Sequence, residues 1–128
     1  MTPLEPRPAL DGARILLVED DFIISMELCL ILAEAGAEII GPCYTPAQAV
    51  ALIDGNKISC AILDFRLGQE TSLPVARQLL RHGVPFTFFA GQVHTSRIHV
   101  EFPDARIIAK PFQDRAILAA LAEICAAC

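Results

Sequence analysis

The chain has 128 residues, of which 54% are hydrophobic and 20% charged, and a formal net charge of −5. This size and composition predict one globular domain with a sizeable core and exclude a disordered chain. The acidic balance argues against a nucleic-acid-binding surface, the apolar runs are shorter than the roughly 18 residues of a membrane span, and no signal-peptide pattern is visible. We therefore expect a cytoplasmic protein that binds neither nucleic acid nor membrane.

After a proline-rich N-terminal arm over residues 1–12, short apolar runs alternate with helical patterns along a single domain of residues 13–128. Strands are predicted at residues 14–18, 38–41, 58–63, 84–90 and 106–109. Helices are predicted at residues 20–36, 45–53, 72–82, 94–100 and 113–127, with a loop at 67–70. Five strand–helix alternations predict an α/β domain whose parallel sheet carries helices on both faces.

Charged residues follow three of the predicted strands. Glu19 and Asp20 follow the first strand, Asp64 the third and Lys110 the fifth. Because the carboxyl ends of parallel strands meet at one edge of a sheet, we expect these groups to lie together. Three close carboxylates repel one another, and Mg²⁺ or Mn²⁺ would relieve that repulsion. A carboxylate that points outward is a competent nucleophile toward phosphorus, and Lys110 would neutralise phosphoryl charge.

One acidic residue of this region has a simpler structural role. Asp20 or Asp21 stands where the first helix should begin, and Asp is a favoured helix N-cap. Thr45 before Pro46 is a second predicted cap, and Gly36 is the predicted end of the first helix.

The five cysteines are an odd number and lie within apolar segments. This pattern predicts reduced thiols that fill the core, not a disulfide framework. Cys125 and Cys128 have a metal-like spacing, but no second ligand pair accompanies them.

Three segments, residues 15–21, 61–68 and 110–112, resemble in order and spacing the receiver domain of bacterial two-component response regulators. The resemblance covers residues 13–127 and implies a flavodoxin-like (βα)5 fold, with a doubly wound five-stranded parallel sheet. It implies that Asp64 is the phospho-acceptor, that Lys110 contacts the phosphoryl group and that a cis bond precedes Pro111. Mg²⁺ would be held by Glu19, Asp20, Asp64 and the main-chain carbonyl of Arg66.

The same resemblance implies the partners. The phosphoryl donor would be a phosphohistidine on a histidine kinase or a histidine phosphotransfer protein. That partner would dock on the first helix, near Phe22, Ile23 and Met26, and on the loop after Lys110; a second copy of the chain is a further candidate. Such a receiver is a signalling protein, not an enzyme, and catalyses only its own phosphoryl transfer and hydrolysis.

Two positions depart from the receiver pattern. Ala90 stands at the end of the fourth strand, where receivers carry Thr or Ser, and Ile107 replaces the usual Tyr or Phe of the fifth strand. Thr87, three residues before Ala90, should face the other side of the sheet and cannot substitute. We expect slower or shorter-lived phosphorylation, because Mg²⁺ and Lys110 supply most of the charge neutralisation. The alternative is a pseudo-receiver that acts only as a protein-interaction module.

Other functions fit the pattern less well. A phosphatase using Asp64 would need a second acid two residues later, where Arg66 stands. A nucleotide-binding module would need a glycine-rich loop after the first strand, and acids occupy that place.

Overall fold

The computed structural model describes residues 8–125 of the chain. Its central feature is a parallel sheet in the order β2-β1-β3-β6-β7. The strands are β1 (Arg14–Val18), β2 (Glu38–Cys43), β3 (Cys60–Asp64), β6 (Phe86–Ala90) and β7 (Arg106–Ala109). The predicted α/β, flavodoxin-like fold with a doubly wound five-stranded sheet is confirmed.

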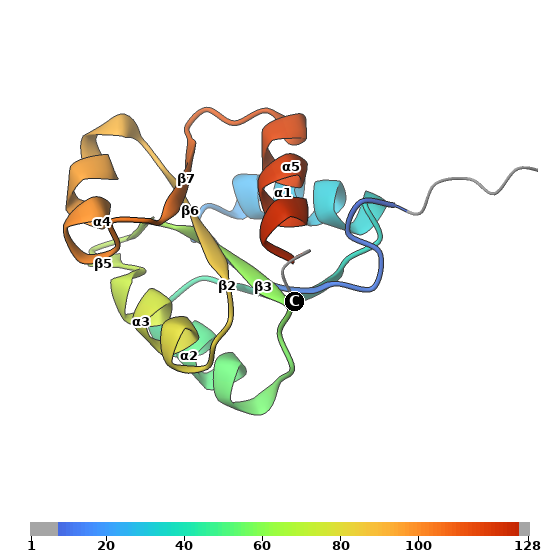
Figure 1. Ribbon diagram of the computed structural model, residues 1–128, viewed down its shortest axis with the longest axis horizontal. Helices are drawn as coiled ribbons and strands as arrows, with labels where there is room; N and C mark the ends of the chain where they lie inside the picture. The colour runs from blue at the N-terminus through green and yellow to red at the C-terminus, as the bar shows by residue number, and fades with distance from the viewer. Residues whose placement is uncertain (1–7, 126–128) are drawn as a thin grey trace, which may run out of the picture.

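Helices cover both faces of the sheet (Figure 1). Helices α1 (Phe22–Glu34) and α5 (Asp114–Cys125) pack on one face. Helices α2 (Pro46–Gly55), α3 (Leu73–Arg81) and α4 (Thr95–Glu101) pack on the other, and a short 3₁₀ turn, η1 (Gln92–His94), precedes α4. In the described part of the chain, no helix is both long and apolar enough to cross a membrane.

Strand β3 shows why the central strands read as continuous apolar runs. Its five residues are all buried. Ile62 packs in the core under α1 and α5, while the next residue, Leu63, packs in the core under α2 and α3. Because successive side chains point to opposite faces, both sets are apolar when both faces are covered.

The predicted helix signals are confirmed. Asp21 caps α1, and its Oδ1 accepts a hydrogen bond from the N–H of Ile24 at 3.0 Å. Thr45 caps α2, with its hydroxyl 3.2 Å from the N–H of Gln48. Gly36 follows α1 with a φ of +90°, a conformation that glycine adopts at low cost.

Two segments differ from the predicted elements. The predicted loop at residues 67–70 contains a small antiparallel hairpin, formed by β4 (Arg66–Leu67) and β5 (Glu70–Thr71). Gly68, with a φ of +64°, permits its tight turn. Strand β2 runs on to Cys43, beyond its predicted end at Gly41, through a cis Gly41–Pro42 bond and an irregularity in its pairing with β1.

The packed part of the domain begins earlier than residue 13. Residues 8–12 form a turn against the end of α1, where the N–H of Leu10 donates to the carbonyl of Ala35 at 2.9 Å. The Leu10 side chain is buried in the core under α1 and α5. The rest of the predicted arm, residues 1–7, lies outside the described residues.

The prediction of reduced cysteines is wrong for one pair. Cys60 and Cys125 form a disulfide, with their Cα atoms 5.9 Å apart. The two residues are distant in sequence, and only the packing of α5 on β3 brings them together. Cys29 and Cys43 are free thiols, as predicted, and Cys128 lies outside the described residues.

Candidate functional site

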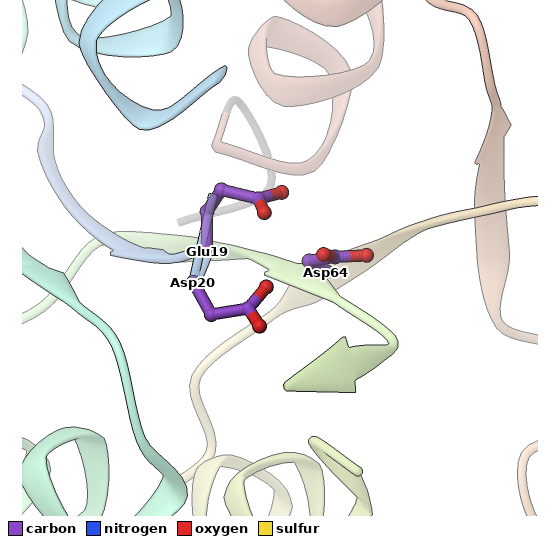
Figure 2. A group of neighbouring side chains, drawn as sticks. All are labelled: Glu19, Asp20 and Asp64. Atoms are coloured by element: carbon purple, nitrogen blue, oxygen red, sulfur yellow. The ribbon is translucent and has the colours of Figure 1, made fainter. Parts of the chain in front are cut away.

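Three carboxylates meet at the carboxyl edge of the sheet. Glu19 and Asp20 follow β1, and Asp64 ends β3 (Figure 2). These two strands are neighbours in register, with Val18 opposite Leu63, so their ends coincide. One ligand oxygen from each of the three carboxylates lies within 4.8 Å of the others. Glu19 and Asp64 are buried and Asp20 is exposed, so the cluster lies at the surface with an open side.

Hydrogen bonds assign different tasks to the three consecutive acids. Asp21 takes the cap of α1, and its own N–H donates to Glu19 Oε1 at 2.9 Å. Asp20 is thereby free of capping. Its Oδ2 accepts from the N–H of Gly68 at 2.8 Å, which ties the end of β1 to the β4–β5 hairpin. Sequence reasoning did not single out Gly68, although a glycine four residues after Asp64 is a signal for a tight turn there.

Glu19 carries the strongest electrostatic perturbation of the site. Burial raises the pKa of its carboxyl from 4.5 to about 8, and the negative charge of Asp64 adds to the rise. The hydrogen bond from the main chain of Asp21 and the charge of Lys110 lower it in part. Among the described residues, Glu19 Oε2 is a buried oxygen without a hydrogen-bond donor. A cation at the cluster would satisfy this oxygen.

Lys110 reaches the cluster from β7, two strands away from β3. Its Nζ lies 2.8 Å from Asp64 Oδ1 and 4.7 Å from the centre of the Phe89 ring. Its main-chain N–H donates to the carbonyl of Ala90 at 3.1 Å, and the following Lys110–Pro111 bond is cis, as predicted. The ammonium therefore holds one oxygen of a buried carboxylate and stays partly exposed to an incoming group.

The donor set fits a hard divalent cation. Carboxylate oxygens are the ligands that Mg²⁺ and Mn²⁺ prefer, and the open side leaves room for water and phosphoryl oxygens. Arg66 lies two residues after Asp64, at the start of β4, and its side chain donates to the Gly68 carbonyl at 3.3 Å. Its carbonyl stays a predicted ligand.

No hydroxyl stands at the end of β6, where Ala90 is buried beside Ala109 of β7. Thr87 does not substitute, because its hydroxyl donates to the Arg106 carbonyl at 3.0 Å, three residues back along the strand. Ile107 pairs with Phe88 and packs against the core under α2 and α3. Ala90 therefore lies at the sheet edge next to Lys110, whereas Ile107 lies inside β7 against the core.

The 3₁₀ turn η1 and helix α4 both contact the aromatic residue beside Asp64, which the sequence did not point out. Phe65 directly follows Asp64 and is fully buried. The ring of His94 lies 4.9 Å from the Phe65 ring, and the Arg97 guanidinium lies 5.5 Å from it. His94 and Arg97 therefore pack over Phe65. Nothing in the sequence pointed to this contact, because His94 belongs to no motif.

An apolar surface borders the site on α1. Phe22, Ile23 and Met26 are 64%, 76% and 50% exposed. Beside them is a cavity of about 480 Å³ between α1 and the segment after β7, lined by Ile24, Glu27, Phe89, Lys110, Pro111 and Phe112. The residues proposed for partner docking from the sequence are thus exposed, and they lie on the helix that lines the cavity together with Lys110.

Comparisons with known proteins point to one class. No protein-family model matches the chain. A response regulator receiver protein from Sinorhizobium medicae shares its fold, with a TM-score of 0.81, 24% identity and coverage of 92% of this chain and 98% of the other. SdrG from Sphingomonas melonis is 35% identical, with a TM-score of 0.76 and coverage of 88% and 96%.

A curated relative is similar over a shorter stretch. The transcriptional regulatory protein PdtaR of Mycobacterium tuberculosis is 30% identical over 66 residues, which are 52% of this chain. The matched stretch spans about a third, 32%, of the length of that relative.

Proposed function

We propose that this chain, which is a receiver domain of the response-regulator family, accepts a phosphoryl group on Asp64. It would do so within a two-component or phosphorelay system. The donor would be a phosphohistidine of a histidine kinase or a histidine phosphotransfer protein. The observation that carries the proposal is the contact of 2.8 Å between Lys110 Nζ and Asp64 Oδ1 beside the carboxylates of Glu19 and Asp20.

The chemistry follows from this arrangement. A carboxylate oxygen of Asp64 bonds to phosphorus while the phosphorus–nitrogen bond breaks, and the imidazole keeps the electron pair. Lys110 loses its partner charge as the acyl phosphate forms and is then positioned to pair with a phosphoryl oxygen. Mg²⁺, held by Glu19, Asp20, Asp64 and the Arg66 carbonyl, would neutralise phosphoryl charge.

The surface around the cluster supports a protein as the phosphoryl donor. The exposed side chains of Phe22, Ile23 and Met26 form an apolar patch beside the cavity at Lys110. Apolar side chains gathered at a functional edge are typical of protein-binding sites. A partner that covers this patch would bring its histidine to the open side of the cluster.

The direct test is incubation of the full chain with acetyl phosphate and Mg²⁺, followed by intact-mass measurement. We expect one phosphoryl adduct, lost in Asp64→Asn and in the presence of EDTA. Asp104→Asn, which removes an exposed acid outside the cluster, is the matched control and should keep the adduct. An adduct of equal yield in Asp64→Asn would contradict the assignment of the acceptor.

The second candidate function, an interaction module that is never phosphorylated, is favoured by Ala90 and Ile107. The two functions separate in the same assay. Ala90→Thr would restore a hydroxyl, and a hydrogen bond to a charged group should prolong the adduct's lifetime about tenfold. If wild type and Ala90→Thr both stay unmodified after long incubation with Mg²⁺, while the chain still binds its kinase, the interaction module is the function.

A further inference from the structure

A disulfide fastens the last helix to the middle of the sheet. Cys60 opens β3, at the end of the strand opposite Asp64, and Cys125 ends α5. The two residues are 65 positions apart in the sequence. The bond therefore joins the final turn of α5 to the central strand of the sheet, within the core under α1 and α5. This feature plays no part in the phosphoryl site.

The two sulfur-bearing residues differ in their access to solvent. Cys60 is fully buried. Cys125 is partly exposed and lines a surface cavity of about 300 Å³, formed with residues 9–13, Ser59 and Ala122. A small thiol can therefore approach Cys125 through this cavity, whereas Cys60 can be reached only by exchange with Cys125.

The other described cysteines are poor competitors for such chemistry. Burial raises the pKa of the Cys43 thiol to about 11 and also raises that of Cys29. Because the thiolate is the reactive form, both thiols stay protonated and inert near neutral pH. Cys29 and Cys43 should therefore compete little with the α5–β3 cysteines for a small disulfide.

We propose that Cys60–Cys125 is a reversible redox site, formed and broken by exchange with a small disulfide and its thiol, of the glutathione class. In formation, the Cys125 thiolate attacks one sulfur of oxidised glutathione, and one glutathione thiolate leaves. The Cys60 thiolate then attacks the Cys125 sulfur of the mixed disulfide and expels the second glutathione. The protein loses two electrons and two protons, and the glutathione disulfide gains them.

In the oxidised form, helix α5 is held on the sheet at its carboxyl end. Its first residue, Asp114, follows Lys110 by only four positions, and its last residue is bonded to β3. Closing a loop of this length restricts the unfolded chain, so reduction should lower the melting temperature by about 10 °C. The redox state of this pair would thereby set the stability of the helix that follows the phosphoryl-site lysine.

The test needs no variant at first. The full wild-type chain is equilibrated in glutathione buffers from reduced to oxidised, exchange is quenched with acid, the free thiols are alkylated in denaturant, and peptides are identified by mass spectrometry. We expect Cys60 and Cys125 to pass together from alkylated to cross-linked, while Cys29 and Cys43 stay alkylated throughout. Alkylated Cys60 in the most oxidising buffer, a cross-link of Cys125 to Cys128, or a cross-link that persists in the most reducing buffer would each overturn the proposal.

A pair of matched variants tests the order of attack. With Cys128→Ser in both, Cys60→Ser should retain one glutathionyl group on Cys125, and Cys125→Ser should retain none on Cys60. The reverse pattern, or equal modification of the two, would show that access through the cavity does not direct the exchange. Circular dichroism shows whether each variant is folded. If a variant does not fold, the glutathione titration of the wild-type chain alone tests the proposal.

Discussion

At the scale of residues, three consecutive acids serve three purposes. Asp21 caps α1, Asp20 is held by the Gly68 N–H, and Glu19 is buried with one oxygen lacking a donor among the described residues. The carboxylates of Glu19 and Asp20 are thus available to form the cluster with Asp64, which is paired with Lys110. The site has no hydroxyl side chain at position 90, where Ala90 stands. Asp64 therefore keeps its charged neighbours but lacks a neutral hydrogen-bond donor.

The raised pKa of Glu19 predicts a pH dependence of stability in metal-free buffer. Its folded-state pKa of about 8 exceeds the usual 4.5, so the folded state binds this proton more tightly than the unfolded state. The stabilisation is complete below about pH 4.5 and is lost as the pH rises through 8. Glu19→Gln does not titrate, so its free energy of unfolding should rise relative to wild type by about 3 kcal/mol between pH 5 and 8.

Urea unfolding in EDTA at several pH values measures this difference. Glu34→Gln, at the exposed end of α1, is the control for losing a carboxylate at the surface. A difference between Glu19→Gln and wild type that stays constant from pH 5 to 8 would show that Glu19 is not held in its neutral form.

At the scale of elements, α1 and β2 show where local patterns are insufficient. Helix α1 is apolar on several sides, with Leu28, Ile31 and Leu32 buried while Phe22 and Ile23 are exposed. Its periodicity predicts a helix but does not say which side faces the sheet. In β2, the predicted end at Gly41 is instead a bend within the strand, because Gly41 adopts a φ of +110° there.

Gly41→Ala tests this bend. An added Cβ would lie 2.8 Å from the Cys43 nitrogen and 3.0 Å from the Leu17 carbonyl oxygen, and both are main-chain atoms. Together with the positive φ, this contact should lower the free energy of unfolding by about 3 kcal/mol. Urea unfolding measures the loss. Gly55→Ala, where nothing lies within 4 Å of the added Cβ, is the control and should change stability by less than about 0.5 kcal/mol. Equal effects at both positions would refute the explanation.

At the scale of the whole molecule, the strand order assembles the site. Strands β1 and β3 are adjacent at the centre of the sheet, so three acids from two segments converge (Figures 1 and 2). Strand β7 lies beyond β6, and the long side chain of Lys110 spans the interval to reach Asp64. Helices on both faces bury this framework, so the strand ends are held by the entire fold.

Because the cluster exists only in the folded state, a cation that binds it should stabilise the molecule. We expect Mg²⁺ in excess of its dissociation constant to raise the melting temperature by about 5 °C. Differential scanning calorimetry with Mg²⁺ and then EDTA measures the change. Asp20→Asn should lose most of the rise and Asp104→Asn should keep it. A rise of the same size in both variants would indicate a general ionic effect.

The sequence by itself determined the alternation of strands and helices, a cap at Asp20 or Asp21 and another at Thr45, and the presence of acids and a lysine at three strand ends. These features could be predicted because periodicity and capping depend on residues a few positions apart. Only the tertiary structure decided that Asp20 joins the cluster instead of capping α1, that Lys110 pairs with Asp64, and that Cys60 meets Cys125. Such contacts join residues that are far apart in the chain. Whether their side chains meet depends on strand register and helix rotation, and only the packing of the whole domain sets these.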